Sequence, residues 1–312
     1  MLREQAVETP ALAANTRRTT SPWKRKAFRE IEALAFVLPY LVAFVLFLGI
    51  PIVYGIYISL NHWNPIIGST GFAGLQQYLD LFNFSILSSQ QFWQSMLNTV
   101  IFVIISVPFL VGIPLIVAYA IYRAPFKNVF RAFYFFPTVL SATAVSAIWV
   151  FLLATQGGAI NDTFGLQVPW LVDQPYAWIS IDVTTVWWSL GFNLIIMYAG
   201  ITQLPQATLD AAAIDGAGTF RTFLFVVIPQ LRNVLAFVFV IATIASFNLF
   251  AQSFLMTGGG PGFSTQSASL YIYNQGFNAL HMGSASAMAF TMGIILAMIA
   301  FFQYRFAQEK VS

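Results

Sequence analysis

The chain has no cysteine and very few charged residues. None of its 312 residues is Cys, which excludes disulfide bonds and thiolate metal ligands. Its two histidines, His62 and His281, are too few to make a convincing metal site. Charged residues make up only 8% of the chain, against about 25% in soluble globular domains. With 58% hydrophobic residues and a mean hydropathy of +0.75, the composition indicates an integral membrane protein.

Catalytic and nucleotide-binding motifs are also missing from the sequence. No catalytic constellation is present, and no G-x-x-x-x-G-K-[ST] motif occurs, so we expect no enzymatic activity and no bound cofactor or metal. The predicted helix interiors lack ionisable residues, because Asp182 and Asp210 fall at their borders. Proton- and ion-driven carriers usually need such residues at membrane depth. If the chain moves a solute uphill, we therefore expect the energy to come from another protein.

Long stretches without charge indicate the spanning helices. A spanning helix needs about 20 apolar residues. Gly, Pro and polar clusters divide the neutral stretches into six predicted helices, near 34–60, 97–122, 132–155, 183–203, 233–256 and 285–304. The expected fold is an all-α polytopic membrane helical bundle.

The positions of the basic residues predict the orientation. Seven Lys and Arg precede the first helix, three lie between the second and third, two between the fourth and fifth, and two follow the sixth. These account for all 14, so the positive-inside rule predicts six crossings with both termini in the cytoplasm. This explains the basic excess without nucleic acid. We expect a cytoplasmic N-terminal segment (1–30) with an amphipathic end near anionic lipid, a membrane domain (31–306) and a cytoplasmic tail (307–312).

The segment 204–232 lies between the fourth and fifth predicted helices, on the cytoplasmic side. Pro205 is suited to begin a short helix, and Gly216 is suited to end it in the left-handed conformation. Thr219 is a candidate cap for a second helix, which Pro229 should kink before the fifth span. The pattern predicts a helix, a glycine turn and a second helix. From the residues alone, this is either a docking element or an ordinary amphipathic connection.

The run DAAAIDGAG at 210–218, followed by Ile228 and Pro229, resembles the EAA signature of ATP-binding-cassette importer permeases. In that family the segment forms a coupling helix that sits in a cleft of the cytoplasmic ATPase. The first residue of the signature is usually Glu, and here it is Asp210. The resemblance implies an ATPase-coupling role for Asp210, Ala211, Ala212, Asp215, Gly216, Ala217, Ile228 and Pro229.

Further segments are similar to the carbohydrate branch of these type-1 permeases. They are PYLVAFVLFLGIPIVYGIYISLN (39–61), GLQQYLDLF (74–82), NTVIFV (98–103), FRAFYFFPTVLSATAVSAIW (130–149) and LMTGGGPGFSTQSASLYIYNQGF (255–277). The last resembles the MalF-like member of the permease pair. The resemblance implies a prokaryotic inner or plasma membrane protein. Its partners would be a second, MalG-like permease, two ATP-binding subunits that use ATP and Mg²⁺, and an extracytoplasmic solute-binding protein.

Polar and aromatic residues of the predicted fourth and fifth helices are candidates for solute contact. Asn248 and Gln252, four residues apart, should share one face of a continuous helix. The full set is Asn193, Tyr198, Ser246, Asn248, Phe250 and Gln252. Alternatively, these residues only hydrogen-bond neighbouring helices. The expected solute is a sugar or oligosaccharide. The alternatives are glycerol 3-phosphate or another polyol-type solute, an amino-acid or peptide permease, a secondary carrier, and a membrane scaffold.

Overall fold

The computed structural model describes residues 36–309 and divides them into two compact parts at Tyr54. The first part is helical from Phe36 and includes a π-helical turn, η1 (Val45–Gly49). The helix continues as α2 (Ile50–Ser59), and the whole segment matches the first predicted span. The predicted N-terminal segment 1–30 lies outside the described residues.

Six spans are the most that the described residues provide. Four helices are long and apolar enough to cross a membrane: Phe36–Ser59, α4 (Leu87–Arg123), α8 (Tyr176–Thr202) and the part Met282–Phe306 of α14 (Met282–Glu309). Two bent pairs pass the same test together, α5 (Lys127–Val139) with α6 (Ala142–Leu153), and Thr219–Gln230 with α12 (Arg232–Phe247). Counting each pair once confirms the predicted number. Because α14 continues to Glu309, the predicted tail 307–312 begins inside a helix.

The prediction of one continuous third helix over 132–155 is wrong. The chain is bent by 95° between α5 and α6. Ser141 has an extended backbone, and its hydroxyl accepts a hydrogen bond from the amide of Ala144 at 3.2 Å. Ser141 is thus the N-cap of α6. At the bend the Leu140 carbonyl accepts from the Trp188 indole at 3.1 Å, so the break leaves this carbonyl satisfied.

The fifth predicted helix, 233–256, is also interrupted. The helix α12 ends at Phe247. After this break the chain is helical again for a short stretch that ends with the π-helical turn η3 (Ser253–Thr257). The hydroxyl of Ser267 donates to the carbonyl of Leu249, and that of Ser269 donates to the carbonyl of Phe247 at 3.5 Å. Side chains from a later segment therefore satisfy the carbonyls that the break exposes.

Several short elements join the spans and were not predicted. The strands β1 (Asn61–Asn64) and β2 (Gly68–Phe72) form an antiparallel hairpin, followed by α3 (Gln76–Asp80). The helix α7 (Ala159–Phe164) follows α6, and α13 (Ala268–Tyr273) with η4 (Asn274–Asn278) precedes α14. The Gln77 amide donates to the carbonyls of Ser59 and Asn61, which joins α3 to the hairpin.

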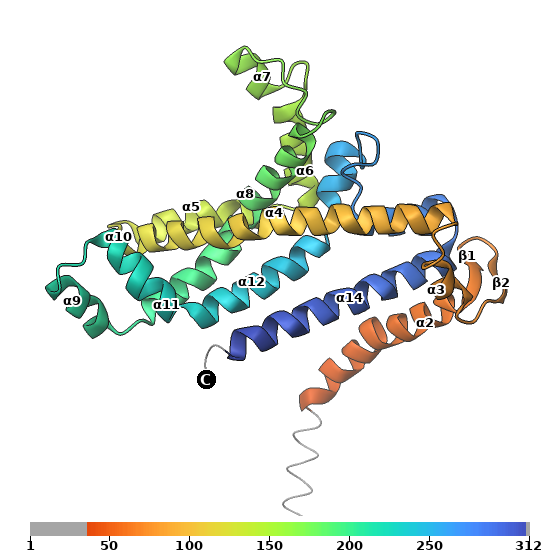
Figure 1. Cartoon of the computed structure of the whole chain (residues 1–312), viewed down its shortest axis with the longest axis horizontal. Coiled ribbons are helices and arrows are strands. Elements are labelled where there is room, and N and C mark those ends of the chain that lie inside the picture. Colours follow the sequence, from red (N-terminus) through yellow and green to blue (C-terminus); the bar gives the residue numbers. More distant parts are fainter. Residues whose placement is uncertain (1–35, 310–312) are drawn as a thin grey trace, which may run out of the picture. The chain divides into compact units, whose positions relative to one another are not determined.

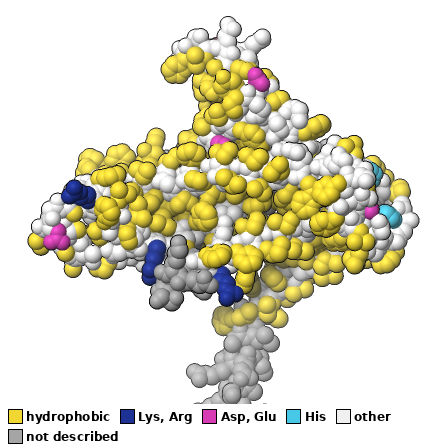
Figure 2. All heavy atoms as spheres, viewed as in Figure 1, with side chains coloured by type: hydrophobic (Ala, Val, Ile, Leu, Met, Phe, Trp, Pro, Cys, Tyr) yellow, Lys and Arg dark blue, Asp and Glu magenta, His cyan; other side chains and the backbone are white. Residues whose placement is uncertain are grey.

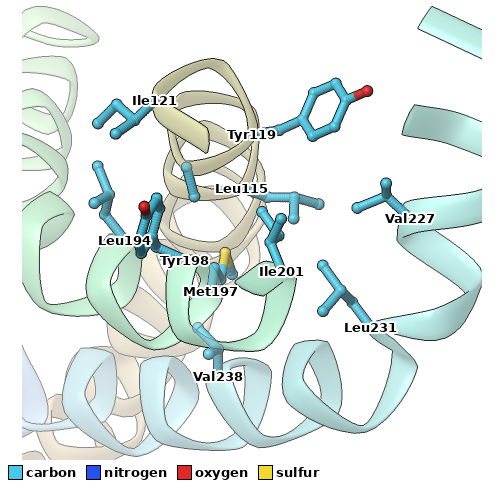
Figure 3. Packing of buried hydrophobic residues seen from close by; sticks show 11 residues of the cluster. Leu115, Tyr119, Ile121, Leu194, Met197, Tyr198, Ile201, Val227, Leu231 and Val238 are labelled. Carbon is cyan, nitrogen blue, oxygen red and sulfur yellow. The ribbon is translucent and has the colours of Figure 1, made fainter. Parts of the chain in front are cut away.

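The helices α4, α8 and α12 pack around one buried core. Its residues are Leu115, Ala118, Tyr119, Ile121, Leu194, Met197, Tyr198, Ile201, Val227, Leu231 and Val238 (Figure 3). The helix α5 lies against α8 at Gly191, where an added Cβ would come within 2.5 Å of the Phe135 Cα atom. Close helix contacts therefore require glycine at this crossing.

The two ends of α4 differ in the segments and in the charged residues that lie beside them. The hairpin and α3 lie at its first end, and the segment 206–230 lies at its second end (Figure 1). Hydrophobic side chains cover most of the visible face over α4, α12 and α14, and Lys and Arg in this view avoid the hairpin end (Figure 2). The described Lys and Arg residues are Arg123, Lys127, Arg131, Arg221, Arg232 and Arg305.

Candidate functional site

The segment predicted to couple to a partner is a set of short helices that we call the elbow, residues 205–231. It contains α9 (Gln206–Ile214), α10 (Thr219–Thr222), the π-helical turn η2 (Phe223–Val227) and α11 (Ile228–Gln230). The predicted order of helix, glycine turn and second helix is confirmed. The second helix is continuous from Thr219 to Gln230 and contains the π-helical turn η2.

Gly216 ends α9 in the predicted way. Its φ is +75°, and its amide bonds to the carbonyl of Ala213 at 3.1 Å. The next amide, that of Ala217, bonds to the carbonyl of Ala212 at 2.9 Å. These two bonds and the left-handed residue define a Schellman motif. The predicted cap at Thr219 is wrong, because Gly218 takes the cap position and Thr219 is already helical.

The elbow meets the fifth span at a sharp bend near Pro229. The axes of Thr219–Gln230 and Arg232–Phe247 differ by 75°, with the break at Leu231. A bend is therefore present where Pro229 was expected to produce one, two residues beyond the proline. Ile228 is half-buried and packs against the core, whereas Pro229 is exposed.

Buried side chains join the elbow to the membrane helices. Val227 and Leu231 are almost completely buried and point toward side chains of α4 and α8 (Figure 3). The ring of Phe223 stacks on that of Tyr119 in α4, with centroids 4.9 Å apart. Since interiors are close-packed, a displacement of the elbow must be accompanied by a displacement of these helices.

The other face of the elbow is open and partly apolar. Ile214 is 86% exposed and Phe220 is 71% exposed. Asp215 and Gly216, which lie between them in the sequence, are also exposed, as is Ala211, whereas Ala212 is buried. Exposed apolar groups among polar ones are typical of protein interaction sites. Sequence reasoning did not select Ile214 or Phe220, although both are apolar residues of the segment 204–232.

Asp210, which replaces the usual Glu, is exposed near the middle of α9. One carboxylate oxygen, Oδ1, accepts a hydrogen bond from the Gln206 amide at 2.9 Å, one turn earlier. The carboxylate also lines a cavity that contains Arg123 and Lys127.

The candidate solute residues do not form one group. Asn248 follows the last residue of α12, is exposed and donates to the Ile244 carbonyl at 2.9 Å, whereas Gln252 is buried beyond the break. The expectation that they share a face of one helix is therefore wrong. Phe250 stacks on Phe254, with centroids 5.4 Å apart, and lines a cavity of about 440 Å³ with Tyr273.

The remaining candidates contact neighbouring elements. Asn193 is buried and donates to the Leu110 carbonyl of α4 at 2.8 Å. Ser246 accepts from the hydroxyl of Ser106 at 3.4 Å. One face of the Tyr198 ring is covered by the Arg131 guanidinium, 4.7 Å from the ring centroid. These contacts fit helix-to-helix packing.

Asp182 requires a correction. The sequence placed it at a helix border, but α8 begins at Tyr176, so Asp182 lies inside a membrane-spanning helix. Its Oδ1 atom is buried and has no hydrogen-bond partner among the described residues. The helix interiors are therefore not free of ionisable groups, and their absence is no longer an argument against a secondary carrier.

The described residues thus form straight and bent apolar spans, with the elbow between α8 and α12. The chain belongs to the family of binding-protein-dependent transport system inner membrane components, whose sequence profile matches residues 81–311. It is a multi-pass membrane protein of the permease class.

Relatives and a solved structure match nearly the whole chain. The probable ABC transporter permease protein YurN of Bacillus subtilis is 31% identical, covering 89% of this chain and 96% of the relative. The lactose transport system permease protein LacF of Rhizobium radiobacter is 29% identical, covering 94% and 99%. A chain of the bacterial alginate ABC transporter, solved in complex with an alginate pentasaccharide-bound periplasmic protein, is 21% identical and covers 93% and 98%, with a TM-score of 0.79. The last match shows that the fold is shared.

Proposed function

We propose that this chain is one permease subunit of an ATP-binding-cassette importer for a sugar or oligosaccharide. The observation that carries the proposal is the elbow, whose buried side packs into α4 and α8 while Ile214 and Phe220 stand exposed. An ATPase subunit docked on this exposed face would move the elbow and, through its buried side, the spans. The chain itself would hold no ATP, Mg²⁺ or other cofactor.

The remaining partners follow from the family. A second permease would complete the path, two ATPase subunits would hydrolyse ATP, and a solute-binding protein would deliver the solute from outside. The described Lys and Arg lie at 123–131, at 221–232 and at Arg305, whereas the connecting stretches 60–86, 154–175 and 248–281 have none. By the positive-inside rule, this alternation supports cytoplasmic termini. Alternating access would then arise from two rigid arrangements of the bundle.

The solute class rests on two supports. The lactose and alginate transport proteins to which the chain is similar both handle carbohydrates by name. Phe250 and Tyr273 line a cavity of about 440 Å³, where their rings offer faces on which a sugar could stack. Glycerol 3-phosphate or another polyol-type solute is the second candidate, and a secondary carrier the third.

Co-purification tests the docking face directly. We expect the Ile214→Asp variant to insert normally but to lose its ATPase subunits, because a carboxylate would be buried in the interface. Ile66→Asp is the matched control, since Ile66 is 75% exposed in the hairpin at the other end of α4. Equal retention of the ATPase by both variants would contradict the proposal.

Transport tests the solute class. The complex, reconstituted in liposomes with its binding protein, should accumulate a labelled neutral saccharide only when ATP is enclosed on the elbow side. Accumulation of glycerol 3-phosphate alone would favour the second candidate. Uptake by this chain without an ATPase, abolished by a protonophore, would establish a secondary carrier and refute the proposal.

A further inference from the structure

A cavity of about 510 Å³ lies between the elbow and the turn that joins α4 to α5. Its cationic lining residues are Arg123, near the end of α4, and Lys127, at the start of α5. Asp210 is the acidic residue among those that line it. The formal charge of these three side chains is net positive, and the cavity is large enough for a small ligand.

Neither cation is neutralised by a described carboxylate. The Lys127 ammonium lies 5.0 Å from the ring centroid of Tyr122, and an Arg123 Nη1 group donates to the Tyr119 hydroxyl at 3.4 Å. Asp210 instead accepts from Gln206. A lysine has three donors and an arginine five, so most of their hydrogen-bonding capacity remains for a ligand.

The tyrosines connect these cations with the elbow. The Tyr119 hydroxyl donates to the Thr219 carbonyl at 3.3 Å, and the Tyr122 hydroxyl donates to the Gln206 side-chain oxygen at 3.4 Å. Both bonds exceed the usual length for a hydroxyl donor. Gln206 and Thr219 of the elbow also line the cavity and carry side-chain donors. An anion with several acceptor oxygens could accept from these two side chains and from both cations, and so hold the elbow against α4.

We propose that this cavity binds a phosphate group and that bound phosphate restrains the elbow. Phosphate offers acceptors in the fork geometry that arginine matches, and its charge suits two neighbouring cations. The group could belong to a free cytoplasmic phosphate compound or to the headgroup of an anionic phospholipid. That the restrained elbow controls transport rests on the proposed function. The binding of phosphate does not depend on it.

The test measures hydrogen exchange of the amides of residues 206–222 in the whole complex, in nanodiscs of neutral phosphatidylcholine. Inorganic phosphate and glucose 6-phosphate are the free probes, and nanodiscs containing phosphatidylglycerol supply the headgroup. At ten times the dissociation constant, exchange should slow about tenfold. A response to the free probes identifies a soluble ligand, and a response to phosphatidylglycerol alone identifies a lipid.

Three variants make the test specific. Arg123→Gln combined with Lys127→Gln should remove the response, while Arg221→Gln, an exposed cation of α10 that does not line the cavity, should keep it. Asp210→Asn removes the opposing charge and should tighten binding. Complex yield and thermal midpoint confirm that each variant is folded.

Three results would overturn the proposal. They are no response of the unaltered complex to any probe, an undiminished response of the double variant, and protection that depends only on the ATPase subunits. The last result would mean that a protein side chain fills the cavity. Sugar uptake is measured separately, so the failure of the proposed transport function would not be confused with failure of phosphate binding.

Discussion

Replacing Gly216 should separate coupling from folding. Its φ of +75° lies in the left-handed region, and an added Cβ would meet no atom within 4 Å. The penalty therefore comes from the backbone conformation at residue 216 itself, because an added Cβ would meet no other part of the described chain. A left-handed non-glycine residue costs about 1–2 kcal/mol, which lowers the equilibrium constant for the capped end of α9 by a factor of about 5–30. Insertion into the membrane should not change.

The side chain at position 216 sets the expected order. Asn tolerates the left-handed conformation, Ala tolerates it poorly, and a β-branched Val is a conformational outlier. Solute-stimulated ATP hydrolysis by the reconstituted complex should thus fall from Gly216→Asn through Gly216→Ala to Gly216→Val. Gly218 is the matched control, because it also has open space but a φ of −67°, which Ala adopts without strain.

Two results would refute this reasoning. If the Gly216→Val complex couples solute to hydrolysis as well as the unaltered complex, the Schellman motif has no part in coupling. If Gly218→Ala fails as badly as Gly216→Val, the loop needs small residues generally, and the left-handed backbone at Gly216 is not the cause.

Three further changes test the membrane helices. Gly191→Ala should destabilise the chain by about 1–3 kcal/mol, because its Cβ would overlap the α5 backbone, whereas Gly112→Ala, with open space, should be tolerated; thermal unfolding followed by tryptophan fluorescence compares them. Ser141→Ala should cost about 0.5–2 kcal/mol by removing the N-cap of α6, and Ser141→Asp should preserve stability in the same assay; equal loss in both would exclude a capping role. Asn193→Ala should lower stability by about 1 kcal/mol through the lost bond to the Leu110 carbonyl and leave solute selectivity unchanged in uptake competition, so altered selectivity would restore Asn193 as a solute contact.

Hydropathy and charge placement predict the number of spans because lipid requires long apolar helices. They do not predict where those helices break. The bend after Val139 depends on Ser141 acting as an N-cap, a local signal that apolar neighbours obscure. The end of α12 at Phe247 depends on hydroxyls of Ser267 and Ser269, which are close only in the folded chain. No pattern within 233–256 indicates that these two hydroxyls bond to carbonyls at the end of α12.

The residues of the candidate site show the same difference between features set locally and features set by the folded chain. Gly216 was found from the sequence because a left-handed residue between a helix and a turn is a local requirement. The solute candidates were chosen on the assumption of continuous helices, and the break after Phe247 removes the shared face of Asn248 and Gln252. Asp182 was misplaced because the predicted helix was started after this charge, whereas the apolar residues that precede it, from Tyr176, already belong to α8.

The position of the elbow would allow a partner docked on a small surface to act on long spans. Its exposed residues Ile214 and Phe220 have little contact with the bundle, whereas Val227 and Leu231 are nearly completely buried in the core shared by α4, α8 and α12. Because the chain bends by 75° at Leu231, a displacement along the axis of Thr219–Gln230 would push α12 sideways. Gly200 allows this close approach, since an added Cβ would lie 3.0 Å from the Leu231 side chain. If the proposed partner docks at Ile214, the force it applies would act on the junction of three spans, and we expect the left-handed turn at Gly216 to be needed for its transmission.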